Sequence, residues 1–122
     1  MQDCKLKSSE ADLMRAIKDY LTYCQNAGKL YFDRLNAGRI IALKGGKPYN
    51  VELCREGTAD FIVLQKLKLL GGISSTRVIF LEVKSLKGKQ RPEQGAFQKL
   101  VEEQGCSYHI VRSVEEVMEI LK

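Results

Sequence analysis

One apolar run near the middle of the chain constrains the fold more than any other feature. Residues 78–81 and Val83 are all apolar, which is typical of a β-strand buried on both faces. Glu82 and Lys84 interrupt the run, and because side chains alternate along a strand, both lie on the same face. Burying a carboxylate and an ammonium is costly unless they pair or bind an ion. The run therefore predicts a core strand that carries either a simple salt bridge or a functional site.

A second apolar strand is expected at residues 61–67, directly after Asp60. If this strand and the strand at 77–85 pair as a hairpin, Asp60 lies near Glu82. Two close carboxylates repel each other and attract a divalent cation, and Lys84 beside them could contact a water or a phosphate oxygen. Metal-assisted phosphodiester hydrolysis uses this combination. The alternative is that Asp60 is an ordinary turn residue before a strand.

The remaining pattern predicts a mixed α/β sandwich with a central sheet, in one domain spanning residues 1–122. Ser9 caps a first helix that ends before Gly28, with Asp12 as its capping-box partner. Pro92 begins a second helix with an apolar face at Phe97, Leu100 and Val101, and Gly105 ends it. A capping box of Ser113 and Glu116 starts a third helix that runs to Leu121.

Five strands are expected, with the first two joined by a tight turn at 36–38. Residues 44–50 are predicted to be a polar loop and residues 71–76 a flexible turn. The strands are expected at 30–35, 39–43, 61–67, 77–85 and 108–111.

Composition narrows the function classes. Lys and Arg number 20 against 15 Asp and Glu, so the net charge is +5, which favours an anionic partner, most often nucleic acid. The cysteines form no C-x-x-C pair and His109 is the single histidine, which disfavours a disulfide framework, a histidine-rich zinc site and Ser-His-Asp chemistry. We expect His109 to be structural and the thiols to be free and packed: Cys4, Cys24, Cys54 and Cys106.

No apolar run approaches the length of a membrane span, and residues 1–5 offer no signal-peptide core. We therefore expect a cytoplasmic protein without a membrane partner.

Two further polar residues lie on apolar helical stripes. Glu10 stands one turn before Leu13. Either it is an ordinary first-turn acid that the helix dipole stabilises, or it points to the sheet and joins the acidic cluster. Gln94 stands one turn before Phe97, beside the apolar face, which is unusual for glutamine; the alternative is a partly exposed helix edge.

The ordered set of these motifs resembles the virus-type replication-repair nuclease (VRR-NUC) family of the PD-(D/E)xK superfamily. The likeness covers nearly the whole chain, although no single motif is specific. It rests on Glu10, residues 34–38, 57–62, 81–85, Gly88, 92–94, 105–113 and 115–116.

The resemblance implies a PD-(D/E)xK restriction-endonuclease-like fold and a site for Mg²⁺ or Mn²⁺. Asp60, Glu82 and the Val83 carbonyl would bind the metal, with Glu10 as an outer or second-metal carboxylate. Lys84 would position or polarise the attacking water, and Gln94 would orient the site.

The chain departs from the family pattern at two positions. Ala59 stands where a proline usually precedes the motif aspartate, and Arg91 stands where a serine or threonine often caps the helix. Neither change removes a metal ligand.

A basic loop follows the strand that carries Glu82. Residues 84–91 contain four cations and no acid, so we expect Lys87, Lys89 and Arg91 to contact DNA phosphates; the alternative is a solvated loop. Because the chain has no tryptophan and no evident aromatic platform, recognition of DNA shape is favoured over base reading.

The leading hypothesis is a structure-selective DNA endonuclease that resembles a Holliday-junction resolvase, acts as a homodimer and serves DNA repair in a bacterial or phage context. The alternatives are a flap or replication-repair nuclease, a catalytically silent nucleic-acid-binding module on the same fold, an RNA nuclease and a restriction enzyme. The expected dimer surface is residues 66–73, where apolar and basic side chains alternate.

Overall fold

A computed structural model describes residues 9–72 and 74–122 of the chain. The elements follow one another in an α/β order in which a group of strands stands between helices. They are α1 (Glu10–Asn26), β1 (Tyr31–Arg34), β2 (Arg39–Lys44), β3 (Lys47–Glu52), β4 (Phe61–Lys68), the 3₁₀ turn η2 (Leu70–Gly72), β5 (Ser74–Val83), α2 (Pro92–Glu103), β6 (Ser107–Val111) and α3 (Val114–Ile120).

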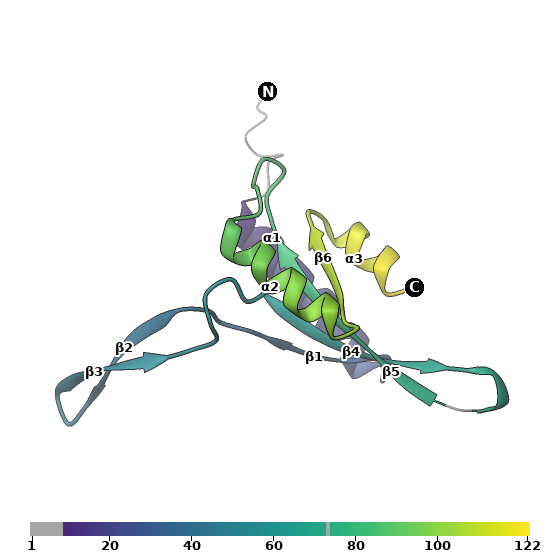
Figure 1. Ribbon diagram of the computed structural model, residues 1–122, viewed down its shortest axis with the longest axis horizontal. Coiled ribbons are helices and arrows are strands. Elements are labelled where there is room, and N and C mark those ends of the chain that lie inside the picture. Colours follow the sequence, from purple (N-terminus) through teal and green to yellow (C-terminus); the bar gives the residue numbers. More distant parts are fainter. Residues whose placement is uncertain (1–8, 73) are drawn as a thin grey trace.

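A mixed sheet with strand order β1-β4-β5-β6 forms the centre of the molecule (Figure 1). Strand β4 pairs antiparallel with both β1 and β5, and β5 pairs parallel with β6. Helix α2 makes the crossover between the two parallel strands, as a parallel pair requires. The predicted α/β class is therefore confirmed, and so is the hairpin of β4 and β5.

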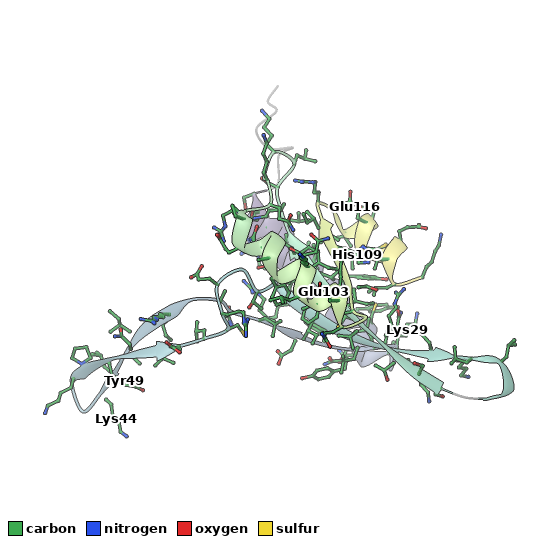
Figure 2. The ribbon with its side chains drawn as sticks, in the orientation of Figure 1. Lys29, Lys44, Tyr49, Glu103, His109 and Glu116 are labelled. Atoms are coloured by element: carbon green, nitrogen blue, oxygen red, sulfur yellow. The ribbon has the colours of Figure 1, made fainter. Side chains whose placement is uncertain are left out.

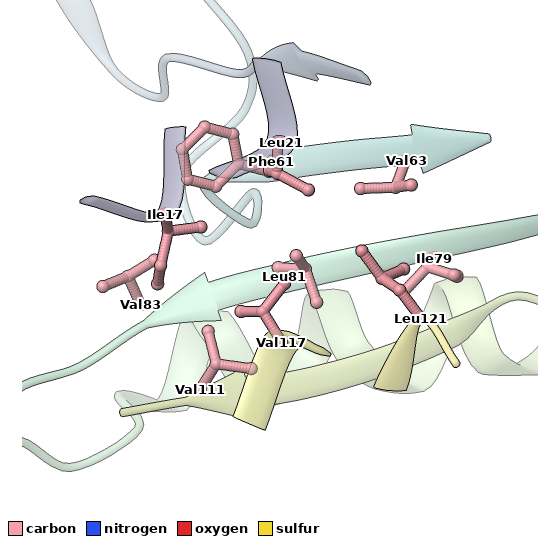
Figure 3. Packing of buried hydrophobic residues seen from close by; sticks show 10 residues of the cluster. All are labelled: Ile17, Leu21, Phe61, Val63, Ile79, Leu81, Val83, Val111, Val117 and Leu121. Carbon is pink, nitrogen blue, oxygen red and sulfur yellow. The ribbon is translucent and has the colours of Figure 1, made fainter. Parts of the chain in front are cut away.

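Helices α1 and α3 cover one face of this sheet and form the hydrophobic core with it (Figure 3). The stripe of Ile17, Leu21 and Cys24 that the sequence predicts is buried along α1. Alternate residues of the strands supply the other side of the core, as the pleat dictates. The buried cluster is Ile17, Leu21, Phe61, Val63, Ile79, Leu81, Val83, Val111, Val117 and Leu121.

Helix α2 packs on the opposite face through a smaller aromatic contact. Phe97 meets Phe80 of β5 edge to face at 5.1 Å between ring centroids, and its ring lies 6.2 Å from that of Tyr108. Gln94 is the buried residue of this helix, whereas Leu100, expected on its apolar face, is half exposed. The α2 face is therefore thinner and more polar than the α1 face.

The predicted helix ends are confirmed in their main contacts. The Ser9 hydroxyl accepts a hydrogen bond from the Asp12 amide at 3.0 Å, and the Ser113 hydroxyl accepts one from the Glu116 amide at 3.1 Å. The Glu116 carboxylate accepts from the Arg112 amide, one residue before the expected cap, so the second half of that capping box is displaced. Pro92 begins α2 as predicted.

Two predictions about the strands are wrong. Strand β2 does not return alongside β1; it pairs with β3 in a separate two-stranded ribbon, and β1 takes β4 as its partner. Residues 44–50 are therefore not a loop, because β3 occupies most of them. The polar residues and the proline of β3 conceal a strand that contacts no core and so shows no buried alternation.

The turn between β4 and β5 is shorter than predicted. Strand β5 begins at Ser74, so the flexible turn expected at 71–76 shrinks to the residues around η2. Strand β5 also ends at Val83, which places Lys84 just beyond it. Ile73 of the expected dimer surface, Cys4 and residues 1–5 lie outside the described residues. In the part that the structure describes, no helix is both long enough and apolar enough to span a membrane.

Gly57 permits the close approach of the 53–60 loop to the start of α2. Its φ angle is +88°, and a Cβ atom there would lie 2.2 Å from the backbone oxygen of Glu93. That contact is impossible without moving either the helix or the loop that leads into Asp60.

We predict that Gly57→Ala lowers the free energy of unfolding by about 3 kcal/mol, because left-handed strain and a backbone clash act together. Gly28→Ala is the control: its φ angle is +77°, but nothing lies within 4 Å of the added Cβ, so it should cost only about 1 kcal/mol. Urea denaturation of both variants measures the difference. Equal losses would show that the approach to Glu93 is unimportant.

Candidate active site

The register of the β4–β5 hairpin brings the two predicted acids together. Phe61 lies opposite Leu81, so the preceding residue, Asp60, stands beside the end of β5 that carries Glu82. The Val83 amide donates a hydrogen bond of 2.7 Å to Asp60 Oδ2. The Asp60 carboxylate is thus held by the backbone amide of the residue that follows Glu82.

Glu82 is buried on the α2 face of the sheet, with 4% of its surface exposed. Its Oε2 accepts a hydrogen bond from Gln94 Nε2 at 2.8 Å and lies 3.5 Å from Lys84 Nζ. Its other oxygen, Oε1, is buried without a hydrogen-bond partner among the described residues. A buried carboxylate oxygen normally has a partner, so this one is available to a ligand.

Gln94 is held in the orientation that suits Glu82. Its Oε1 accepts a hydrogen bond from the Arg91 amide at 2.9 Å, which leaves Nε2 to donate to Glu82. The same side chain therefore satisfies an amide at the start of α2 and holds the acid of β5. Gln94 is buried, so the alternative of a partly exposed helix edge is wrong, and its role in orienting the site stays a prediction.

Arg34 is a site residue that the sequence analysis missed. Its guanidinium Nη1 lies 3.5 Å from Asp60 Oδ1 and also donates to the backbone oxygens of Asp60 and Leu35. The guanidinium stands 5.7 Å from the centre of the Phe61 ring, within the range of a cation–π contact. Residues 34–38 belong to the family resemblance, but only the pairing of β1 with β4 brings Arg34 beside Asp60.

The polar groups surround a cavity of about 230 Å³ whose wall is mostly polar. Glu10 reaches it from the first turn of α1, and Arg91 reaches it from the start of α2. The other lining residues are Arg34, Leu35, Asn36, Ala37, Gly57, Thr58, Asp60, Glu82, Lys84 and Gln94.

Three predicted residues do not line this cavity. Lys87 lies at a second, larger cavity of about 540 Å³ between α1 and the start of α3. Lys89 is exposed and lines neither cavity. The Val83 side chain is buried in the core on the opposite face, so only its backbone is near the acids.

Burial and mutual repulsion act on both acids. Burial, with the nearby Asp60 charge, raises the pKa of Glu82 to about 7, although Lys84 opposes the rise. Burial also raises the pKa of Asp60, while the Val83 hydrogen bond and Arg34 counteract it. The charged forms are therefore disfavoured in the metal-free protein, and a cation bound beside the acids would favour them.

The site fits a divalent cation in part through its own side chains. The unpartnered Glu82 Oε1 and the adjacent Asp60 carboxylate are hard oxygen donors of the kind that Mg²⁺ and Mn²⁺ prefer. Within the described ranges, no three side chains of Asp, Glu, His or Cys form a ligand set by themselves. A cation at this position would need further oxygens from the backbone, water or a substrate.

The described cysteines and the single histidine do not line this cavity. Cys24, Cys54 and Cys106 are free thiols, as predicted, and His109 lies on β6 away from the cavity lining. Comparison with protein-family models, curated proteins and solved structures found no match to this chain.

The raised pKa of Glu82 predicts how stability depends on pH in the metal-free protein. The folded-state pKa of about 7 exceeds the ordinary 4.5. The contribution of protonated Glu82 to the free energy of unfolding is therefore fully present below pH 4.5 and is lost as the pH rises through 7. We expect the free energy of unfolding to fall by about 2 to 3 kcal/mol over this window relative to Glu82→Gln.

Urea titrations in EDTA, compared between the wild type and Glu82→Gln, measure this difference. Glu103→Gln, on the exposed end of α2, is the control for loss of a surface carboxylate. Parallel pH curves for the wild type and Glu82→Gln would contradict the prediction.

Proposed function

We propose that this protein is a metal-dependent, structure-selective DNA endonuclease that hydrolyses phosphodiester bonds. The observation that carries the proposal is the buried Glu82, which has one oxygen held by Gln94 and Lys84 and the other without a partner, beside Asp60 in an open polar cavity. The contact with Lys84 involves Oε2 and leaves Oε1 without a partner, which a bound cation would supply. The motif resemblance to VRR-NUC nucleases supports the same activity and a PD-(D/E)xK fold.

Asp60 and Glu82 would hold the cation, with the Val83 carbonyl, and Glu10 would add an outer carboxylate. A bound Mg²⁺ or Mn²⁺ supplies Lewis acidity toward the scissile phosphate and lowers the pKa of a water. The protein positions these acids firmly: the Val83 amide and Arg34 hold Asp60, and Gln94 holds Glu82. Rigid placement of charged groups before the reaction is what electrostatic catalysis requires.

Lys84 has a separate role in this proposal. Its ammonium is largely buried, lies on the same side of the chain as Glu82 and borders the cavity. There it would orient the attacking water and stabilise the negative charge that grows on the phosphate. Its pairing with Glu82 keeps it in place before the substrate binds.

DNA would approach along the basic loop between β5 and α2. Arg91 lines the cavity itself and also pairs with Glu93 at 3.1 Å. Lys87 and Lys89, earlier in the loop, are exposed and lie outside the cavity. This loop carries four cations in a chain of net charge +5, which suits a polyanion.

We expect Asp60→Asn and Glu82→Gln each to reduce cleavage by about a hundred-fold or more, because each removes a charged oxygen donor. Binding of DNA should remain. The measurement is cleavage of labelled linear duplex, flap and four-way-junction DNA in Mg²⁺ or Mn²⁺, and Asp19→Asn on the outer side of α1 is the control.

The junction is expected to be cut best, and preferential cutting of the flap would redirect the proposal to a flap nuclease. Binding without cleavage by the wild type would indicate a silent nucleic-acid-binding module. Wild-type turnover in both variants would refute the proposed site.

Lys84→Met is predicted to slow cleavage by about ten-fold or more without a comparable loss of metal affinity, because the ammonium acts on the reacting oxygens and not on the cation. Single-turnover rates and Mn²⁺ titration separate the two effects. Lys99→Met, exposed on α2, is the control for loss of a lysine charge. Near-normal rates would leave Lys84 as a structural partner of Glu82.

Paired cuts in a four-way junction would require two copies of the site, so we propose a homodimer. The far end of the β4–β5 hairpin carries exposed Leu67, Leu69 and Leu70, and these apolar side chains could meet their copies in a second chain.

Light scattering should give about 28 kDa for a dimer, against 13.8 kDa for one chain. Leu69→Ser with Leu70→Ser should return the mass to that of the monomer, with Leu100→Ser on α2 as the control. A wild type that stays monomeric, alone and on junction DNA, would exclude paired cutting.

A further inference from the structure

The ribbon formed by β2 and β3 extends away from the body of the molecule (Figure 1). It is a sheet of its own, hydrogen-bonded within itself and not to the four central strands. An isolated two-stranded hairpin is only marginally stable in water. A partner that covers it would therefore stabilise its ordered form.

Both faces of the ribbon expose apolar side chains. Ile41 and Leu43 are 72% and 71% exposed, and Leu43 lies directly opposite Pro48 on the same face. On the other face, Ile40 and Tyr49 are half exposed. Figure 2 shows Tyr49 and Lys44 on this ribbon, away from the helices. Leu43 and Pro48 lie one residue pair from the tip, where they can act as a wedge.

Two lysines stand opposite each other at the tip. Lys44 pairs across the ribbon with Lys47, and Gly45 and Gly46, with φ angles of +60° and +80°, make the turn between them. Like charges directly across a strand pair are destabilising. The ion pairs among the described residues include neither lysine, so a polyanion would relieve their repulsion.

The base of the ribbon is joined to the candidate active site. The Gly38 amide donates to the Cys54 carbonyl at 2.9 Å, and the Cys54 amide donates to the Asn36 carbonyl at 2.8 Å. Asn36 and Ala37 then line the cavity that holds Asp60. A duplex with one phosphate at the acids would thus lie alongside the ribbon.

We propose that the β2–β3 ribbon is an arm that grips double-helical DNA next to the cut, an inference that rests on the proposed nuclease function. Lys44 and Lys47 contact phosphates of one DNA strand from one face of the ribbon, and Leu43 with Pro48, on the opposite face, packs against sugars of the other strand. Proteins that bind grooves commonly combine cations with apolar wedges of this kind. Six residues of strand reach about 20 Å, or about six base pairs of duplex.

The test is the salt dependence of binding to a fluorescein-labelled linear duplex, followed by anisotropy in EDTA so that no cleavage occurs. Lys44→Gln with Lys47→Gln should weaken binding roughly ten-fold and reduce the slope of log affinity against log salt by about 1.8, which is two phosphate contacts. Lys18→Gln with Lys29→Gln removes the same charge from exposed positions on and just after α1 and is the matched control.

The wedge is tested separately. Leu43→Ser should weaken binding without changing the salt slope, because an apolar contact releases no counterions. Leu100→Ser, half exposed on α2, is its control. All four variants change exposed side chains outside the core, and circular dichroism verifies that they fold.

The outcomes separate the arm from the nuclease function. If the Lys44 and Lys47 variant keeps the wild-type slope while substitution of Lys87, Lys89 and Arg91 lowers it, the protein binds DNA but the ribbon does not, and the arm is refuted alone. Equal losses in the matched control would reduce the effect to net charge and refute it too. A wild type that binds no DNA overturns both proposals. A change from dimer to monomer in Leu43→Ser, with DNA binding unchanged, would make the ribbon a contact between copies.

Discussion

The hydrogen bond from Gln94 to Glu82 joins the two parts of the structure on which the site depends. It links the end of the central strand β5 to the first turn of α2. It also gives Glu82 Oε2 a hydrogen-bond donor, which partly offsets the cost of burying the charged carboxylate. Because the Gln94 amide is itself held by the backbone of Arg91, the position of the acid follows the position of the helix. The approach of Gly57 to the backbone of Glu93 then locates that helix against the loop that carries Asp60.

The two faces of the central sheet serve different purposes. On the face of α1 and α3, apolar side chains from β4, β5 and β6 form the buried core, and Phe32 of β1 packs against it. The opposite face has little apolar packing besides Phe80, Phe97 and Tyr108, so polar groups can gather beside it without breaking a core. Strands anchored on one side can therefore present Glu82 on the other at a well-defined position, at the energetic cost that its raised pKa records.

Several features of the site follow from local sequence alone. The apolar run with Glu82 and Lys84 identifies the central strand, and the short separation of β4 from β5 makes their hairpin pairing, and hence the approach of Asp60, predictable. The helix caps are equally local, since each depends on residues within one turn. The partner of β1 is not predictable in this way, because alternation indicates a strand without indicating which strand it will meet. Arg34 was missed for that reason.

The sequence by itself determined the three helices, the strands of the central sheet, the candidate acids and the basic character of the chain, because these depend on residue type and on neighbours a few positions away. Only the tertiary structure decided that Glu10 and Arg91 face the acids, that Lys87 and Lys89 do not, and that residues 39–52 form a free ribbon. The ribbon is a local hairpin that buries neither face and so shows no buried alternation, whereas the other two outcomes depend on segments that meet across long stretches of chain. The loop entropy and packing that select such contacts leave no periodic trace in the sequence.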